Sequence, residues 1–313
     1  MIENSNHKES KYYVRILSPR GVYPDESVFF DDAAYVKGRD ISFSVCRCNK
    51  NQKDYENKSY SEVEWLKPTE ARLYGSLMLA VDRDVSYCAF YPYPHLEMLT
   101  YNSDMPYRTW LLKAVKPYLQ RKYSDPDVLH PGYSLPERNL YRWSFDILPP
   151  PMFGGPDYEF RDHGIDYKLS KNIFCNINTH DDLMIRGITT LIKSAMLHFH
   201  YQFFESAIHS LFISMEVSFR LVVRTLKEKG ILEPTSKDAM AYIHDSFNDV
   251  YRIEHYFEEY YENRVTTFHP ESRFGIFPHA PLQADDYYFL FNDLLEIYAF
   301  LICGYIHPKY NNL

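Results

Sequence analysis

The sequence predicts an α+β protein in two parts: an N-terminal domain of mixed helices and strands over residues 1–170, and an all-α helical bundle over residues 171–313. In the first half, short runs are rich in β-branched and aromatic residues. From Asp181 onward, apolar residues recur at spacings of three and four instead. The stretch "PPPMFGGPD" between the halves cannot continue a helix or a strand. We therefore expect the first half to fold separately, with a boundary between residues 149 and 180.

The elements of the first half are predicted from local composition. Three runs are predicted strands: "YYVRIL" (12–17), "ISFSVCRC" (41–48) and "LYRWSFDIL" (140–148). Residues 107–123 predict a helix that is kinked near Pro117, because proline removes a backbone donor. The polar residues 49–59 predict an exposed loop. Two apolar stretches, residues 71–81 and 87–94, fit a helix and a strand equally well.

The second half predicts four helices, at residues 181–200, 202–230, 233–264 and 282–305. The second is the clearest, because one face collects the apolar side chains Phe204, Ile208, Leu211, Met215, Phe219, Val222 and Leu226. Two aspartates favour the start of the first helix, and Gly230 is a stop signal for the second. Thr235 or Ser236 is expected to cap the third. Short connections, apart from a long loop at 270–282, predict a helical bundle.

Charge and cysteine content limit the function classes. The formal net charge is −8, and residues 180–313 carry 11 Lys and Arg against 18 Asp and Glu. Such a chain can hold nucleic acid only through a local basic patch. The five scattered cysteines favour a reducing compartment over a disulfide framework.

The N-terminal residues are polar, and no apolar run is expected to span a bilayer, so we expect a cytoplasmic protein without membrane association. The sequence has no P-loop, dinucleotide fingerprint or paired cysteines at zinc-ribbon spacing. We therefore expect no cofactor and no metal.

The stretch "YYENRVTTFHPESRFG", residues 260–275, contains the strongest candidate catalytic residues. Arg264 and His269 would point about 140° apart on a regular helix. However, Pro270 disfavours helical backbone at His269, so the helix is expected to end near Phe268 and the histidine could turn back toward the arginine. The carboxyl end of a helix also favours a protonated imidazole, which suits proton transfer.

A helical bundle of this size with R-x4-H at the end of its third helix resembles the HEPN superfamily (higher eukaryotes and prokaryotes nucleotide-binding domain), over residues 175–313. The stretches "SMEVSFRLVVRTL" and "YYFLFNDLLEIYAFL" are also similar to that family. Many such domains are metal-independent ribonucleases in toxin–antitoxin, abortive-infection and RNA-processing systems.

The resemblance implies that Arg264 and His269 are the catalytic pair and that a homodimer joins two pairs in one cleft. Asn263, next to the arginine, is a supporting candidate. Arg273, in the loop after Pro270, could contact the RNA, although a position on the loop surface without a functional role is the preferred interpretation. An antitoxin or another protein partner is consistent with the resemblance. RNA cleavage itself favours a dimer, because one proton must be removed while another is supplied, and two-fold symmetry provides a second histidine.

Three alternatives stay open. Val265 stands where the family often has Asn, Asp or His, which favours a catalytically inactive dimeric scaffold that binds RNA or a protein partner. Glu216 and Arg220 are spaced for a surface ion pair, the preferred interpretation, but Glu216 could instead orient a catalytic arginine. In the first half, basic residues alternate with aromatics and could bind RNA: Lys113, Lys116, Arg121 and Lys122. The favoured alternative there is an amphipathic helix with its aromatics packed inward.

Overall fold

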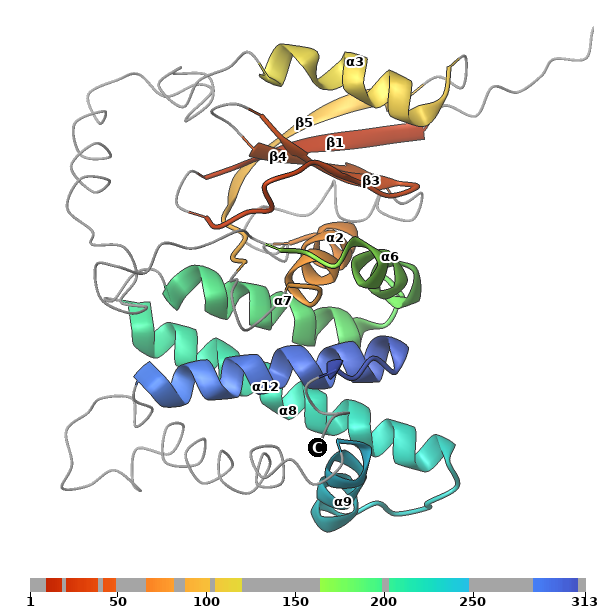
Figure 1. Cartoon of the computed structure of the whole chain (residues 1–313), viewed down its shortest axis with the longest axis vertical. Helices are drawn as coiled ribbons and strands as arrows, with labels where there is room; N and C mark the ends of the chain where they lie inside the picture. Colours follow the sequence, from red (N-terminus) through yellow and green to blue (C-terminus); the bar gives the residue numbers. More distant parts are fainter. Residues whose placement is uncertain are drawn as a thin grey trace, which may run out of the picture. The chain divides into compact units, whose positions relative to one another are not determined.

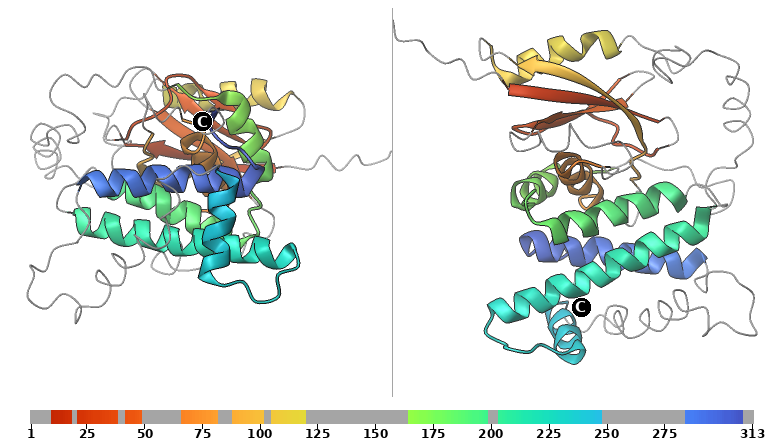
Figure 2. Two further views of the ribbon diagram at one scale, coloured as in Figure 1. Left: turned by 60° about the horizontal axis from the view of Figure 1, so that its bottom comes forward. Right: turned by 180° about the vertical axis from the view of Figure 1, so that it is seen from behind.

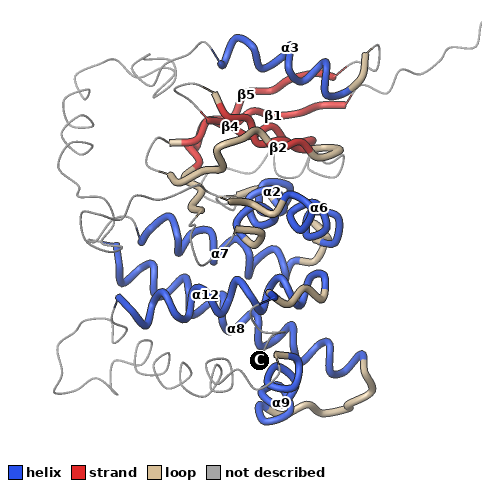
Figure 3. Tube along the Cα trace, viewed as in Figure 1, coloured by secondary structure: helices blue, strands red, loops and turns tan. Residues whose placement is uncertain are grey.

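The computed structural model describes residues 10–18, 21–38, 42–48, 66–81, 88–101, 105–119, 164–198, 203–247 and 284–308 (Figure 3). The chain divides into two compact units. Unit 1 comprises Met1–Tyr74 and Val85–Gly164, and unit 2 comprises Gly75–Asp84 and Ile165–Leu313. The protein is therefore of the α+β class, with an antiparallel sheet in its N-terminal part and helices throughout the described residues of unit 2. Whether residues 1–170 fold independently stays a prediction.

Unit 1 is built on one antiparallel sheet with the strand order β2-β3-β4-β1-β5. The strands are β1 (Ser10–Leu17), β2 (Val28–Phe29), β3 (Ala33–Lys37), β4 (Ser42–Arg47) and β5 (Pro92–Tyr101). The strands predicted at 12–17 and 41–48 are confirmed as β1 and β4, which pair in register from Tyr12↔Arg47 to Leu17↔Ser42. The strand predicted at 140–148 and the loop predicted at 49–59 lie outside the described residues.

Helix α3 (Tyr107–Leu119) covers one face of this sheet (Figure 1). Alternate residues of β1, namely Tyr12, Val14 and Ile16, pack there against Trp110 and neighbouring apolar residues of α3. The predicted helix is confirmed as far as Leu119, and it continues through Pro117. Pro117 removes one backbone hydrogen bond there, and the helix ends two residues later, at Leu119.

The other face of the sheet packs against the first turns of helix α2 (Pro68–Met78). Tyr35 and Tyr74 are completely buried, and the Tyr74 ring stacks on Phe90 with centroids 4.6 Å apart. Strand β1 is consequently buried on both faces, so its residues do not alternate between apolar and polar. The ambiguous stretch 71–81 lies mostly in this helix, and the unit boundary falls within it, after Tyr74.

Unit 2 contains the helices α6 (Tyr167–Asn176), α7 (Asp182–His198), α8 (Phe204–Glu228), α9 (Ser236–Ser246) and α12 (Ala284–Cys303). Helices α7 and α8 form an antiparallel hairpin, and α12 lies alongside both (Figure 2). Three of the four predicted helices are confirmed as α7, α8 and α12. The third, predicted over 233–264, is confirmed only in its first part, because α9 ends at Ser246 with Phe247 as its C-cap, and residues 248–264 lie outside the described residues. Helix α6 was not predicted.

The expected helix signals are present. Gly230 adopts a φ of 95°, and the Ile231 amide donates to the Leu226 carbonyl, which ends α8 in the glycine-dependent way that the sequence predicted. Thr235 caps α9, and Asp238 completes a capping box by accepting from the Thr235 amide.

Helices α7, α8 and α12 approach closely where their side chains are small. A Cβ on Gly187 would lie 2.1 Å from the Tyr298 hydroxyl, so only glycine fits there. That hydroxyl donates to the Ser214 carbonyl at 2.8 Å. About two turns further along α7, the Ser194 hydroxyl donates to the Ala207 carbonyl of α8 and bonds the Tyr287 hydroxyl of α12, both at 2.8 Å. Hydroxyl groups in this tightly packed seam are therefore satisfied by the neighbouring helices.

By length and composition alone, α8 is apolar enough to cross a membrane, which is weak evidence for a membrane span. However, 61% of its most apolar window is buried inside the protein, as in the core helix of a soluble domain. Cytoplasmic localisation stays a proposal.

The α7–α8 hairpin is tied together by Asp181. Its carboxylate accepts from the Met184 amide at 3.2 Å, which caps α7, and from Arg224 on α8 at 2.6 and 3.1 Å. Burial would raise the pKa of Asp181, but the bonds from Arg224 and from backbone amides lower it below its ordinary value. Asp181 therefore stabilises the fold above the unfolded-state pKa of about 3.9, and this stabilisation is lost as the pH falls through the lower folded-state pKa.

We predict that Asp181→Ala lowers the free energy of unfolding by about 1–2 kcal/mol at neutral pH, because both the cap and the ion pair are lost. Asp181→Asn keeps a capping oxygen and should cost only about 0.5 kcal/mol, since Arg224 is partly exposed. Urea denaturation between pH 7 and pH 2 measures both differences. The difference between wild type and Asp181→Asn should disappear in acid. Equal costs for the two variants at pH 7 would contradict a capping role.

Candidate functional site

The predicted catalytic residues lie outside the described part of the chain. Asn263, Arg264, His269 and Arg273 belong to residues 248–283, which connect α9 to α12. Their roles stay predictions. The described residues on either side of this segment nevertheless show where it begins and which helix it enters.

Helix α9 ends against the C-terminal part of α12. The rings of Tyr242 and of Phe247, the C-cap residue of α9, lie 5.9 and 5.4 Å from the Phe300 ring of α12. The connecting segment therefore begins beside the face of α12 that carries Phe300.

The same face of α12 carries two buried carboxylates, which sequence reasoning missed. Asp293 and Glu296 are each only 1% exposed. On an ideal helix they lie within about 60° of Phe300 and opposite Tyr298, which contacts α8. Carboxylates are kept at such depth only when their charge is compensated. Their sequence signal was two acidic residues inside "FLFNDLLEIYAF", an otherwise apolar run.

Glu216 on α8 forms the ion pair that its spacing predicts. Its Oε1 lies 3.2 Å from Nε of Arg220, and the two side chains are 35% and 62% exposed. The geometry agrees with the preferred interpretation, an ion pair at the helix surface that stabilises the fold by a few tenths of a kcal/mol. Whether Glu216 also orients a catalytic arginine stays a prediction.

On α3, Lys113 and Lys116 are exposed, whereas Trp110 is buried against the sheet. The favoured alternative, an amphipathic helix with its aromatics inward, therefore holds at these positions. Arg121 and Lys122 lie outside the described residues. RNA binding by the lysines stays a prediction.

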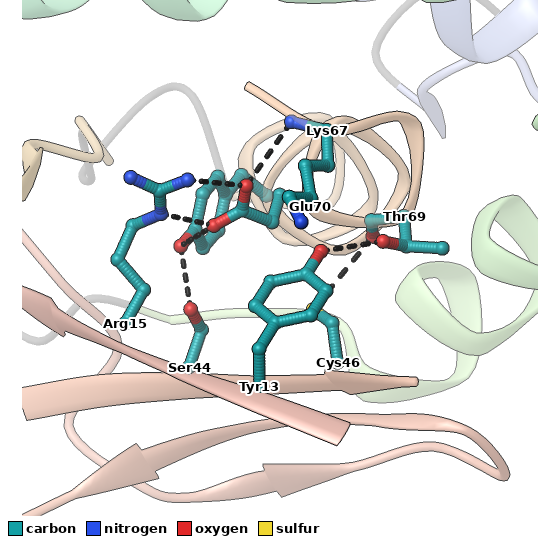
Figure 4. A network of polar contacts seen from close by, with 8 residues as sticks. Tyr13, Arg15, Ser44, Cys46, Lys67, Thr69 and Glu70 are labelled. Carbon is teal, nitrogen blue, oxygen red and sulfur yellow. Dashed lines mark hydrogen bonds and ion pairs between the residues drawn. The ribbon is translucent and has the colours of Figure 1, made fainter. Parts of the chain in front are cut away.

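The most extensive buried polar network lies in unit 1, and the sequence analysis did not predict it. Arg15, in the middle of β1, is 3% exposed and forms a two-pronged ion pair with the fully buried Glu70 of α2 (Figure 4). Glu70 also accepts from the Lys67 amide at 3.1 Å, so the same carboxylate caps the start of α2.

Hydroxyl groups surround this pair. The Ser44 and Tyr74 hydroxyls lie 2.5 Å apart, and Tyr74 also donates to Glu70 at 3.4 Å. Nearby, the hydroxyls of Tyr13 and Thr69 share a hydrogen bond of 2.6 Å, and the Lys67 ammonium lies over the Tyr13 ring. Every polar side chain in this network thus has a partner inside unit 1 (Figure 4).

The electrostatics of the network argue against acid–base catalysis. Burial and the charge of Glu70 hold the pKa values of Tyr13 and Tyr74 well above the ordinary value, and burial does the same for the Cys46 thiol. Burial opposes the charge of Arg15, but Glu70 raises the pKa of the guanidinium above its usual range. The tyrosines and the thiol therefore stay protonated and Arg15 stays charged. We interpret the network as a structural clamp between β1 and α2.

Among the described residues, no group of three or more His, Cys, Asp and Glu side chains is arranged to hold a metal ion. The metal-independent mechanism expected from the sequence stays a prediction.

The clamp predicts strong energetic coupling. Arg15→Met or Glu70→Gln alone should lower the free energy of unfolding by about 3–5 kcal/mol, because each leaves a buried charge without its partner. The double variant should lose much less than the sum. Urea denaturation of the four proteins gives the coupling energy.

The exposed pair Glu216 and Arg220 provides the matched control. The same cycle with Glu216→Gln and Arg220→Met should give a coupling below about 0.5 kcal/mol. Additive effects at Arg15 and Glu70 would show that the clamp contributes no more than a surface pair.

The chain matches no family model, no curated protein and no solved structure.

Proposed function

We propose that the protein is a metal-independent endoribonuclease of the HEPN type, which acts as a cytoplasmic homodimer, in a bacterial defence or toxin-like role. Arg264 and His269 are the proposed catalytic residues, with Asn263 in support and Arg273 contacting the RNA. The helical bundle of unit 2 is the proposed catalytic part, and unit 1 is a sensor or specificity domain. No cofactor is required.

One observation on the described residues supports this proposal most directly. The segment that holds Arg264 and His269 begins at Phe247, beside the face of α12 on which Asp293 and Glu296 are buried. A guanidinium placed near that face would find carboxylates that fix its position. A catalytic arginine needs such fixing, because its charge must already be in place when negative charge develops on the phosphate.

The proposed chemistry is transesterification of RNA. His269 removes the proton from a ribose 2′-hydroxyl, whose oxygen attacks the adjacent phosphorus. His269 of the second copy donates a proton to the 5′-oxygen as its bond to phosphorus breaks. The products are a 2′,3′-cyclic phosphate and a free 5′-hydroxyl. The two Arg264 side chains stabilise the negative charge on the non-bridging oxygens.

A catalytically inactive dimeric scaffold that binds RNA or a protein partner is the second candidate. The observation that favours it is Val265, an apolar residue where the ribonucleases that the chain resembles often have a polar one. The excess of acidic residues over 180–313 is also more typical of a protein-binding surface than of an RNA-binding one.

We predict that the purified protein cleaves single-stranded RNA in the presence of a chelator and leaves 2′,3′-cyclic phosphate ends. Arg264→Ala and His269→Ala should each lower the rate by on the order of a hundredfold or more. The measurement is cleavage of end-labelled RNA, with thermal melting to confirm folding. Arg186→Ala and His180→Ala, which change exposed residues of unit 2, are the matched controls and should cleave normally. Cleavage that survives both catalytic substitutions would refute the assignment, and so would loss of cleavage with chelator.

The composite site predicts a two-fold homodimer. Light scattering at micromolar concentration should give twice the mass of the 37.3 kDa chain. Mixing Arg264→Ala chains with His269→Ala chains tests the shared cleft, because each mixed dimer keeps one arginine and one histidine on different chains. Activity above that of either parent variant would support such a cleft. A monomer in solution would exclude a cleft shared between two copies.

A further inference from the structure

The exposed face of α3 carries positive charge only. Its outward-facing residues include Arg108, Lys113 and Lys116, and the sequence of the helix, "YRTWLLKAVKPYL", contains no Asp or Glu. On an ideal helix these three cations fall within an arc of about 140° and span about 12 Å along the axis. This is unusual for a chain that carries 42 acidic residues against 34 basic ones.

A fourth cation, Arg47 at the end of β4, belongs to the same face. It is exposed, and it donates to the Ser10 hydroxyl at 2.9 Å. Burial raises the pKa values of Tyr12 and of Tyr107, the first residue of α3. The positive charge of Arg47 lowers both pKa values by a smaller amount, which places Arg47 near both rings. Asp32 acts on the same two tyrosines, but its carboxylate is engaged by Arg72 at 2.6 and 2.7 Å. Among the described side chains named here, the charge on this face is therefore positive.

The described aromatic rings of α3 face the sheet and not the solvent. Trp110 is 9% exposed, and its ring lies 5.1 Å from Tyr12 and 4.9 Å from Tyr101. Tyr107 stacks on Tyr12 at 5.3 Å. These rings cannot stack on an unpaired base without leaving the core. A ligand of this face would therefore be held by charge and not by base stacking.

We propose that Arg47, Arg108, Lys113 and Lys116 form a docking surface for the phosphate backbone of single-stranded RNA, independent of base sequence. This inference rests on the proposed ribonuclease function, to which it adds a second contact with the substrate. A nucleic-acid strand presents a phosphate about every 3.4 Å when its bases are stacked, so 12 Å of helix spans three to four phosphates.

RNA fits this surface better than a membrane. A helix that binds a lipid surface exposes an apolar face to it. The apolar face of α3 is buried by the sheet, and Leu112 is the one large apolar side chain that α3 is seen to expose among its described residues, at 45%. The surface therefore offers cations with little apolar area to insert.

Binding by charge alone makes a quantitative prediction. Each phosphate contact contributes about −0.7 to the slope of log affinity against log salt concentration for a single strand. Four contacts give a slope of about −2.8, or a loss of roughly 50-fold between about 50 and 200 mM salt. Lys113→Gln/Lys116→Gln should reduce the slope by about 1.4, so the loss falls to about sevenfold.

The test uses the full chain and a fluorescent oligouridylate whose 2′-hydroxyls are methylated, so it cannot be cleaved. Fluorescence anisotropy over a salt series gives the slope. The control is Lys168→Gln/Lys171→Gln, which removes two exposed lysines from α6 and should leave the slope unchanged. Melting temperatures verify that both variants fold.

The result that overturns the inference is an unchanged slope in the α3 variant, or an equal change in the control. Stronger binding to phosphatidylserine vesicles than to RNA, lost in the α3 variant, would also overturn it. The measurement does not involve Arg264 or His269. RNA cleavage with an unchanged slope would therefore refute this surface alone, and a reduced slope without cleavage would refute the ribonuclease alone.

Discussion

The burial of one arginine is the constraint on which the organisation of unit 1 depends. Arg15 lies on β1, an inner strand of a sheet that is covered on both sides, so water cannot solvate its charge. A buried guanidinium is tolerated only with a well-placed carboxylate. Glu70 supplies it from the first turn of α2 and binds the Lys67 amide with the same group. The position of α2 on the sheet therefore follows from the position of one charge.

The tyrosines around the pair extend this dependence. A buried hydroxyl without a partner costs free energy, so Tyr74 must find an acceptor once its ring is stacked on Phe90. It lies within hydrogen-bonding distance of Ser44 and Glu70, which belong to the two elements that it joins. In a low-dielectric interior such bonds reinforce one another. Unit 2 meets the same requirement without charge in the seam of α7, α8 and α12, where serine and tyrosine hydroxyls bond neighbouring helices around Gly187.

Sequence patterns predicted the elements whose signals are local. Strands β1 and β4 are dense in aromatic and β-branched residues, and α8 repeats its apolar side chains at helical spacing. Helix α6 was not predicted because it is short and rich in lysine and asparagine. Its apolar face, which includes Leu169 and Ile173, is too small to give a clear helical periodicity. Helix α2 stayed ambiguous because it is buried nearly all round, which removes the periodicity, although Pro68 and Glu70 are a valid start signal.

Contacts between distant residues could not be predicted in this way. The sequence shows that Arg15 in a buried strand requires an acidic partner, but it does not show which of 42 acidic residues provides it. Similarly, Asp293 and Glu296 are visible as acidic residues in an apolar helix, but their depth depends on packing that local patterns do not encode. The proposed catalytic pair was inferred from resemblance and lies outside the described residues.

The overall charge of the protein sets a physical condition on the proposed RNA contact. At about 0.1 M salt the Debye length is about 10 Å, so the α3 cations act on a phosphate in contact with them, while acidic residues further away are largely screened. At about 0.01 M salt the length grows to about 30 Å, and the net charge of −8 then repels the RNA as a whole. The attraction between the α3 cations and nearby phosphates therefore acts at all these salt concentrations, whereas the repulsion between the whole protein and the RNA becomes important only at low salt. At the lowest salt concentrations, we expect the affinity for RNA to rise less steeply than the slope calculated from four phosphate contacts, because the repulsion by the net negative charge is no longer screened there.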